Sequence, residues 1–137
     1  MINFTLHRHT AKISCCFYDK SGLCEVVATG VLTSDAITSL SAQAASKLQD
    51  ATALVVRLDC ALIVMDLRHW PARKRDQNWE PPVALVVAPD TYVSAIALCE
   101  KLAEEGLIRA VFLPSQAELA YRWAARHAGL AHRAMPE

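Results

Sequence analysis

Three runs of apolar residues without a helical period dominate the second half of the chain. The first lies within residues 51–67, where 53–58 have the composition of a strand that is buried on both faces. Residues 83–88 and 108–113 repeat this composition. A segment with helical periodicity separates the last two runs, which gives the order strand, crossover, strand, helix, strand. We therefore predict an α/β fold whose core is a parallel sheet.

The first third of the chain alternates apolar and polar residues, as half-buried strands do. Residues 12–18 and 23–29 are joined by a four-residue turn that ends in Gly22, and this pattern predicts a hairpin. If Tyr18 pairs with Leu23, the apolar side chains of the two strands share one face. We predict an antiparallel N-terminal meander that joins the parallel core in one mixed sheet, with helices packed on it.

Three segments carry helical periodicity together with residues that commonly start or end helices. Gly30 is predicted to end the preceding strand, and the first helix is predicted to begin at Thr33 or Ser34. The second helix is predicted to begin at Asp90 and to end at Gly106. The third is predicted to begin with a capping box at 115–118 and to end at Gly129.

Composition and charge restrict the class of protein. The 137 residues, 53% of them hydrophobic, match a single domain spanning 1–137. Fourteen basic and fourteen acidic residues cancel, which argues against nucleic acid as a partner and favours self-association, so a homodimer stays open. No secretory pattern opens the chain, and charges interrupt its longest apolar run, so no membrane span is predicted. Five cysteines without a CxxC spacing suit buried thiols in a reducing cytoplasm.

Ligands of open α/β sheets gather where the carboxyl ends of the parallel strands lie, an edge called the rim below. Asp59 and Cys60 follow the first predicted core strand and fall at this rim. The favoured interpretation of Cys60 is a buried, unreactive thiol, because free cysteine is among the most buried residue types. The alternative is a small α/β enzyme that uses Asp59 and Cys60, with Arg68 holding an anion.

The segment 66–80 combines cations with tryptophan in one long irregular connection, which is typical of functional or mobile loops. It is interpreted as a loop anchored by its tryptophans, with contact to a protein or an anionic ligand as the alternative. The predicted contact residues at the rim and in this segment are Asp59, Cys60, Asp66, Arg68, Trp70, Arg73, Arg75 and Trp79.

No metal site or cofactor is predicted. His7 and His9 would share one face of a strand, but no third ligand lies nearby in the sequence. Cys15 and Cys16 point to opposite faces of their strand and cannot bind one ion together. The sequence also lacks a nucleophile elbow and a phosphate-binding loop.

The predicted order of elements resembles the STAS domain (sulfate transporter and anti-sigma-factor antagonist), in particular the stand-alone bacterial SpoIIAA-like proteins. The residues that carry the resemblance span about 23–127. They are Gly30-Val31-Leu32-Thr33 with the helix positions Ala36, Leu40, Ala44 and Leu48; residues 54–59; residues 83–88; and residues 111–118, which lead into Ala120-Tyr121-Arg122-Trp123.

The resemblance implies a STAS-like module without enzymatic activity that binds a protein partner, a nucleotide or an apolar ligand. Phosphorylated members carry Asp-Ser-x-Gly at the helix after the central strand, whereas this chain has Asp66-Leu67-Arg68-His69. The phosphorylation switch therefore does not carry over. We expect a binding or regulatory module that contacts a protein partner or a small or apolar ligand through residues 66–80 and the rim.

Overall fold

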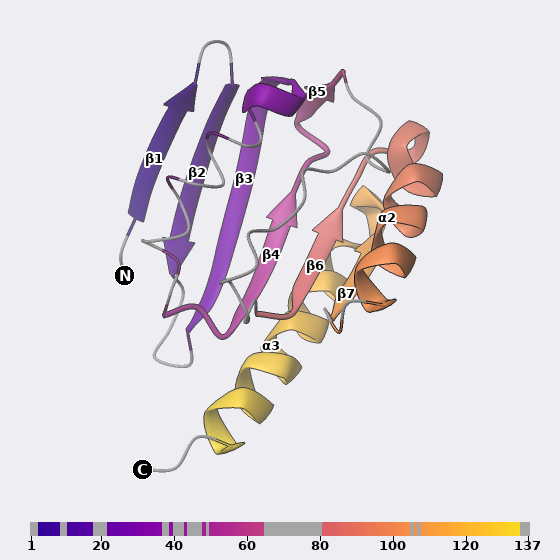
Figure 1. The fold of residues 1–137 in the computed structure, drawn as a ribbon. Helices are drawn as coiled ribbons and strands as arrows, with labels where there is room; N and C mark the ends of the chain where they lie inside the picture. The colour runs from indigo at the N-terminus through magenta and orange to yellow at the C-terminus, as the bar shows by residue number, and fades with distance from the viewer. Residues whose placement is uncertain are drawn as a thin grey trace.

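The computed structural model of the chain describes residues 3–8, 11–17, 22–36, 39, 43, 48, 50–64, 81–104, 106 and 108–134. They form an α/β fold built on one mixed sheet (Figure 1). The strands are β1 (Asn3–Arg8), β2 (Ala11–Phe17), β3 (Leu23–Leu32), β4 (Ala53–Arg57), β5 (Ala61–Ile63), β6 (Val83–Val86) and β7 (Arg109–Phe112). The helices are α2 (Tyr92–Glu104) and α3 (Ala117–Ala134), each preceded by a 3-10 turn, η2 (Pro89–Thr91) and η3 (Pro114–Gln116).

The sheet has the order β1-β2-β3-β4-β6-β7, and β5 pairs with β3 beyond the end of β4. β1, β2 and β3 are antiparallel, while β3, β4, β6 and β7 run parallel. Phe17 lies opposite Cys24, which is the register that a Tyr18–Leu23 pair predicts. Cys15, Cys24 and Val26 accordingly share one apolar cluster. The predicted mixed sheet and its hairpin register are confirmed.

The prediction that Gly30 ends the strand is wrong. β3 continues through Gly30, whose φ is 86°, to Leu32. Glycine adopts this backbone conformation without a Cβ clash, so the strand can bend and keep its pairing. β3 then has room for two parallel neighbours, β4 along residues 23–27 and β5 along residues 30–32.

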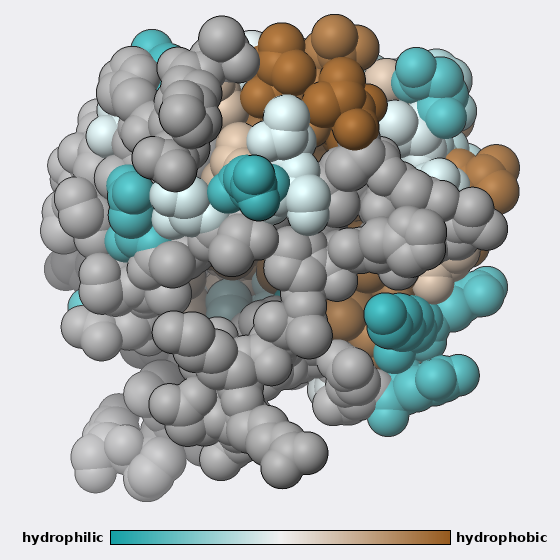
Figure 2. Space-filling model, turned by 45° about the horizontal axis from the view of Figure 1, so that its top comes forward, coloured by the Kyte–Doolittle hydropathy of each residue, from teal (hydrophilic) through white to brown (hydrophobic). Residues whose placement is uncertain are grey.

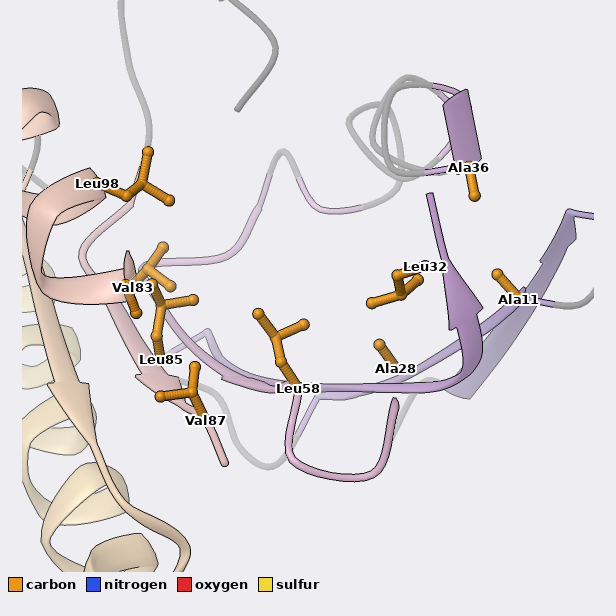
Figure 3. Packing of buried hydrophobic residues seen from close by; sticks show 10 residues of the cluster. Ala11, Ala28, Leu32, Ala36, Leu58, Val83, Leu85, Val87 and Leu98 are labelled. Carbon is orange, nitrogen blue, oxygen red and sulfur yellow. The ribbon is translucent and has the colours of Figure 1, made fainter. Parts of the chain in front are cut away.

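The sheet is covered on both faces of its parallel part, with α2 on one side and α3 on the other (Figure 1). In β6, Val83 and Leu85 belong to the cluster that includes Leu98 of α2, whereas Ala84 and Val86 belong to the cluster that includes α3. Figure 3 shows the first cluster reaching across the sheet from α2 to the N-terminal strands. All four residues of β6 are buried, which confirms the prediction for 83–88. Every residue of β7 is only half-buried, so the same prediction for 108–113 is wrong.

α3 approaches the sheet through small residues. Ala120, Ala124 and Ala128 recur at helical spacing, and each has 0% exposure. They pack against alanine and valine side chains of β4 and β6. The helix continues past Gly129 to Ala134, so the predicted end at Gly129 is wrong. No helix among the described residues is both long and apolar enough to cross a membrane.

Thr33 caps the helical turn that follows β3, as predicted. Its Oγ1 accepts a hydrogen bond from the backbone N–H of Ala36 at 3.1 Å, and residues 34–36 are helical. Such a bond satisfies one of the N–H groups that the first turn of a helix leaves without a partner. Gly106, two residues past the end of α2, has a φ of 83°, the left-handed conformation predicted for the C′ residue of this helix.

Two predicted helix starts are wrong for a common reason. A proline opens a 3-10 turn ahead of each helix, so the cap lies one residue before the proline. Asp90 is an exposed residue inside η2 and does not cap it. In η3, the side-chain oxygen of Gln116 accepts a hydrogen bond from the backbone N–H of Leu113 at 3.0 Å. The predicted box at 115–118 is replaced by this contact, which lies two residues earlier.

Candidate functional site

The carboxyl ends of β3, β4, β6 and β7 lie along one edge of the sheet, because these strands are parallel (Figure 1). Asp59 and Cys60 form the turn between β4 and β5 at this rim. The turn is held at its base, where the backbone N–H of Leu58 donates to the carbonyl of Val86 at 2.8 Å. The N–H of Ala61 donates to the carbonyl of Leu58 at 3.3 Å. The residues after the turn form the short strand β5.

Asp59 is paired with Arg57 through two hydrogen bonds. The Nε and Nη2 atoms of Arg57 donate to Oδ1 and Oδ2 of Asp59 at 3.2 and 2.8 Å. The Asp59 side chain is only 10% exposed and that of Arg57 28%. The pKa of Arg57 is raised, first by the hydrogen bond to Asp59, and negative charge at Cys60 and Glu25 adds to the effect.

This geometry limits what Asp59 can do chemically. Both of its carboxylate oxygens accept hydrogen bonds from one guanidinium, which orients the carboxylate. A general base needs an oxygen that reaches the proton it abstracts. Asp59 therefore closes the turn between β4 and β5, and the ion pair fixes the backbone that presents Cys60.

Cys60 is exposed, so the prediction of a buried thiol is wrong. The reason is local, because the two-residue turn projects from the rim while the strands on either side enter the sheet. The Arg57 cation lies close enough for a Cys60 thiolate to contribute to the shift in the Arg57 pKa. The exposed thiol is the observation that supports the alternative of a reactive cysteine.

No metal site is found among the described residues, and the one described imidazole is engaged within α3. His127 is the one histidine whose side chain is described, and its Nδ1 lies 2.9 Å from the carbonyl of Trp123 within α3. No group of three His, Cys, Asp or Glu side chains among the described residues could hold a metal ion. Six predicted contact residues lie outside the described residues, and so does His9. The six are Asp66, Arg68, Trp70, Arg73, Arg75 and Trp79.

An apolar surface at the rim was not predicted from the sequence. Leu62 and Val64 have exposures of 63% and 53%. They lie two residues apart on an extended segment and therefore point to the same side. Figure 2 shows hydrophobic side chains gathered at the top of the molecule, over β5. Their alternation with the half-buried Ala61 and Ile63 is the signal that could have identified the exposed pair within the apolar run.

We expect brief alkylation of the native protein by iodoacetamide to modify Cys60 well before Cys15 or Cys24. Cys60 is exposed, whereas Cys24 has 0% exposure and burial raises its pKa to about 11. At pH 8 only about one thousandth of the Cys24 thiol would be thiolate. Mass mapping of the labelled peptides measures the order. Modification of all five cysteines in denaturant is the control, and labelling of Cys24 as fast as Cys60 would contradict the burial.

No protein-family model matches the chain, and no curated protein sequence matches it either.

Proposed function

We propose that the chain is a binding or regulatory module of STAS-like fold without enzymatic activity. Its contact surface comprises rim residues 59–64 together with the segment 66–80. The partner is a protein or a small apolar ligand. The observation that carries the proposal is the exposure of Leu62 and Val64, two apolar side chains at the rim.

Exposed apolar side chains that adjoin one another on one side of a sheet are typical of interaction surfaces. Val31 lies opposite Leu62 in the ladder between β3 and β5 and is half-buried. The apolar surface formed by Leu62 and Val64, called the exposed strip, therefore extends across two strands. The segment 66–80 begins two residues after Val64 and contains two tryptophans and four cations. Aromatic residues and arginine are the types enriched in the centres of protein interfaces.

The rim chemistry supports binding more than catalysis. Asp59 is bound to Arg57 at both oxygens, and the one histidine side chain in the described part of the chain is engaged with a backbone carbonyl within α3. The second candidate is a small α/β enzyme with Cys60 as nucleophile, favoured by the exposed thiol and the neighbouring Arg57 cation. One variant distinguishes the two candidates. Cys60→Ser would abolish the activity of an enzyme that uses this cysteine as its nucleophile, whereas it would leave a binding surface almost unchanged.

The binding proposal is tested with two sets of variants on the proposed surface. Leu62→Asp with Val64→Asp changes the exposed strip, and Trp70→Ala with Arg73→Glu changes the adjoining segment. We expect each pair to reduce capture of the wild-type set of partners from a lysate by about tenfold or more, since both alter the centre of the surface. Quantitative mass spectrometry of the captured proteins measures the loss.

The matched control is Val93→Asp, which places the same charge on another exposed apolar residue, 78% accessible on α2. Its captured set should equal that of the wild type. Circular dichroism confirms that every variant is folded. Unchanged capture by both double variants would refute the surface assignment, as would an equal loss in the Val93→Asp control.

A further inference from the structure

An open groove runs between α2 and the outer edge of β7. Its volume is about 310 Å³, and its walls include Ile96, Cys99 and Glu100 from the helix and Arg109, Ala110 and Val111 from the strand. Successive residues of a strand point to opposite faces. Three consecutive residues of β7 can line one groove only if the groove reaches the edge of the strand itself. The groove therefore exposes the strand's backbone as well as its side chains.

The hydrogen bonds of β7 show which backbone groups face this groove. The carbonyls of Ile108 and Phe112 accept from the N–H groups of Val83 in β6 and of Val87 just after it, both at 3.0 Å. In a parallel ladder alternate residues bond to the same neighbour. Val111 therefore directs its N–H and C=O away from β6. Within the described chain β7 has β6 as its one partner strand. The next outward N–H, that of Leu113, donates to the side-chain oxygen of Gln116. The edge that is open to a further strand therefore lies at Val111.

We propose that this groove is a dimer interface in which β7 pairs with β7 of a second copy of the chain, antiparallel about a two-fold axis. At such an axis Val111 lies opposite Val111 of the partner, and the two residues exchange both N–H···O=C bonds. Each Val111 thereby provides hydrogen-bond partners for the outward N–H and C=O groups of Val111 in the other subunit. The two sheets become one continuous sheet, and the two grooves face each other.

The charges of the groove fit a second copy better than an unrelated segment. Among the described residues that line it, the groove carries one acid, Glu100, and one base, Arg109. In an isologous interface each of the two can meet its opposite in the other subunit. Arg109 is held in place by donating from Nη1 to the carbonyls of Pro81 and Ile108 at 3.1 and 2.9 Å. The formal charge of the chain is zero, so no net repulsion separates two copies.

The test measures the molar mass of the full chain over a range of concentrations by sedimentation velocity. We expect the wild type to form a dimer. Val111→Pro removes the outward N–H and keeps the bonds to β6, since proline is tolerated at a sheet edge, and this variant should be monomeric. Glu100→Arg should weaken the dimer about tenfold, because a two-fold axis repeats the change. Glu104→Arg is the matched control, an exposed acid one turn further along α2, and should leave the dimer unchanged.

Circular dichroism shows whether Val111→Pro is folded, and if it is not, the comparison of Glu100→Arg with Glu104→Arg decides alone. A wild type that stays monomeric at every concentration overturns the proposal. A dimer that Glu100→Arg weakens no more than Glu104→Arg also overturns it, since such a dimer uses another surface. A monomer whose Val111 N–H becomes protected from hydrogen exchange only when an extended peptide is added shows a different occupant and overturns it as well.

Discussion

Ala124→Leu is expected to destabilise the protein by about 3 kcal/mol, the upper end of the range for overpacked cores. Ala124 has 0% exposure and lies in the cluster where α3 packs against Val55 and Val86. A leucine would insert three carbon atoms where the helix and sheet already touch, so the helix would have to move away from the strands. Thermal or urea denaturation measures the change, and a midpoint lower by about 10 °C is expected.

The matched control is Ala125→Leu. Ala125 is the next residue of α3 and is exposed, so the same substitution adds its side chain to the solvent-facing side. We expect a change within about 0.5 kcal/mol. Equal destabilisation by the two variants would contradict the orientation of α3 on the sheet.

Gly22→Ala is the second substitution with a large expected effect, again about 3 kcal/mol. Gly22 has a φ of +88°, and a Cβ built there would lie 2.9 Å from the carbonyl oxygen of Asp50 and 3.0 Å from Oγ1 of Thr52. Alanine therefore adds a steric clash to the cost of the left-handed conformation. The clash also disturbs the hydrogen bond from the N–H of Thr52 to the carbonyl of Gly22, which is 3.0 Å long. Equilibrium unfolding in urea measures the loss.

Gly106→Ala separates the two contributions. Gly106 has a similar φ of +83°, but a Cβ there meets nothing within 4 Å. Only the conformational cost of about 1 kcal/mol should remain. If both variants lost the same stability, the contact of Gly22 with residues 50 and 52 would not be rigid, and the steric argument would fail.

The parts of the fold that local chemistry determines could be predicted from the sequence. The register of β2 and β3 follows from a short turn and from alternating side chains, and the pairing of Phe17 with Cys24 agrees with it. β6 was recognisable because a strand covered by helices on both faces must be apolar at every position. Thr33 was recognisable as a cap because its hydroxyl bonds to the backbone of its own helix.

The parts that failed depend on neighbours distant in the sequence or on competing local geometry. Asp90 has the side chain of a good cap, but the preceding proline favours a 3-10 turn whose cap is the residue before it. Cys60 is apolar by type, yet its exposure depends on how β4 and β5 share β3 as a neighbour. Leu62 and Val64 could not be distinguished from core residues by composition, because burial depends on what covers the other side of the strand.

β3 is bonded to β2 on one side and to β4 and β5 in succession on the other. It is thus both the last strand of the meander and the first strand of the parallel sheet. The meander cannot detach without exposing the backbone of β3, and the parallel part cannot open without doing the same. The ten residues of β3 therefore couple both regions into one cooperative unfolding unit, and its amide protons should exchange with solvent only when the whole molecule unfolds.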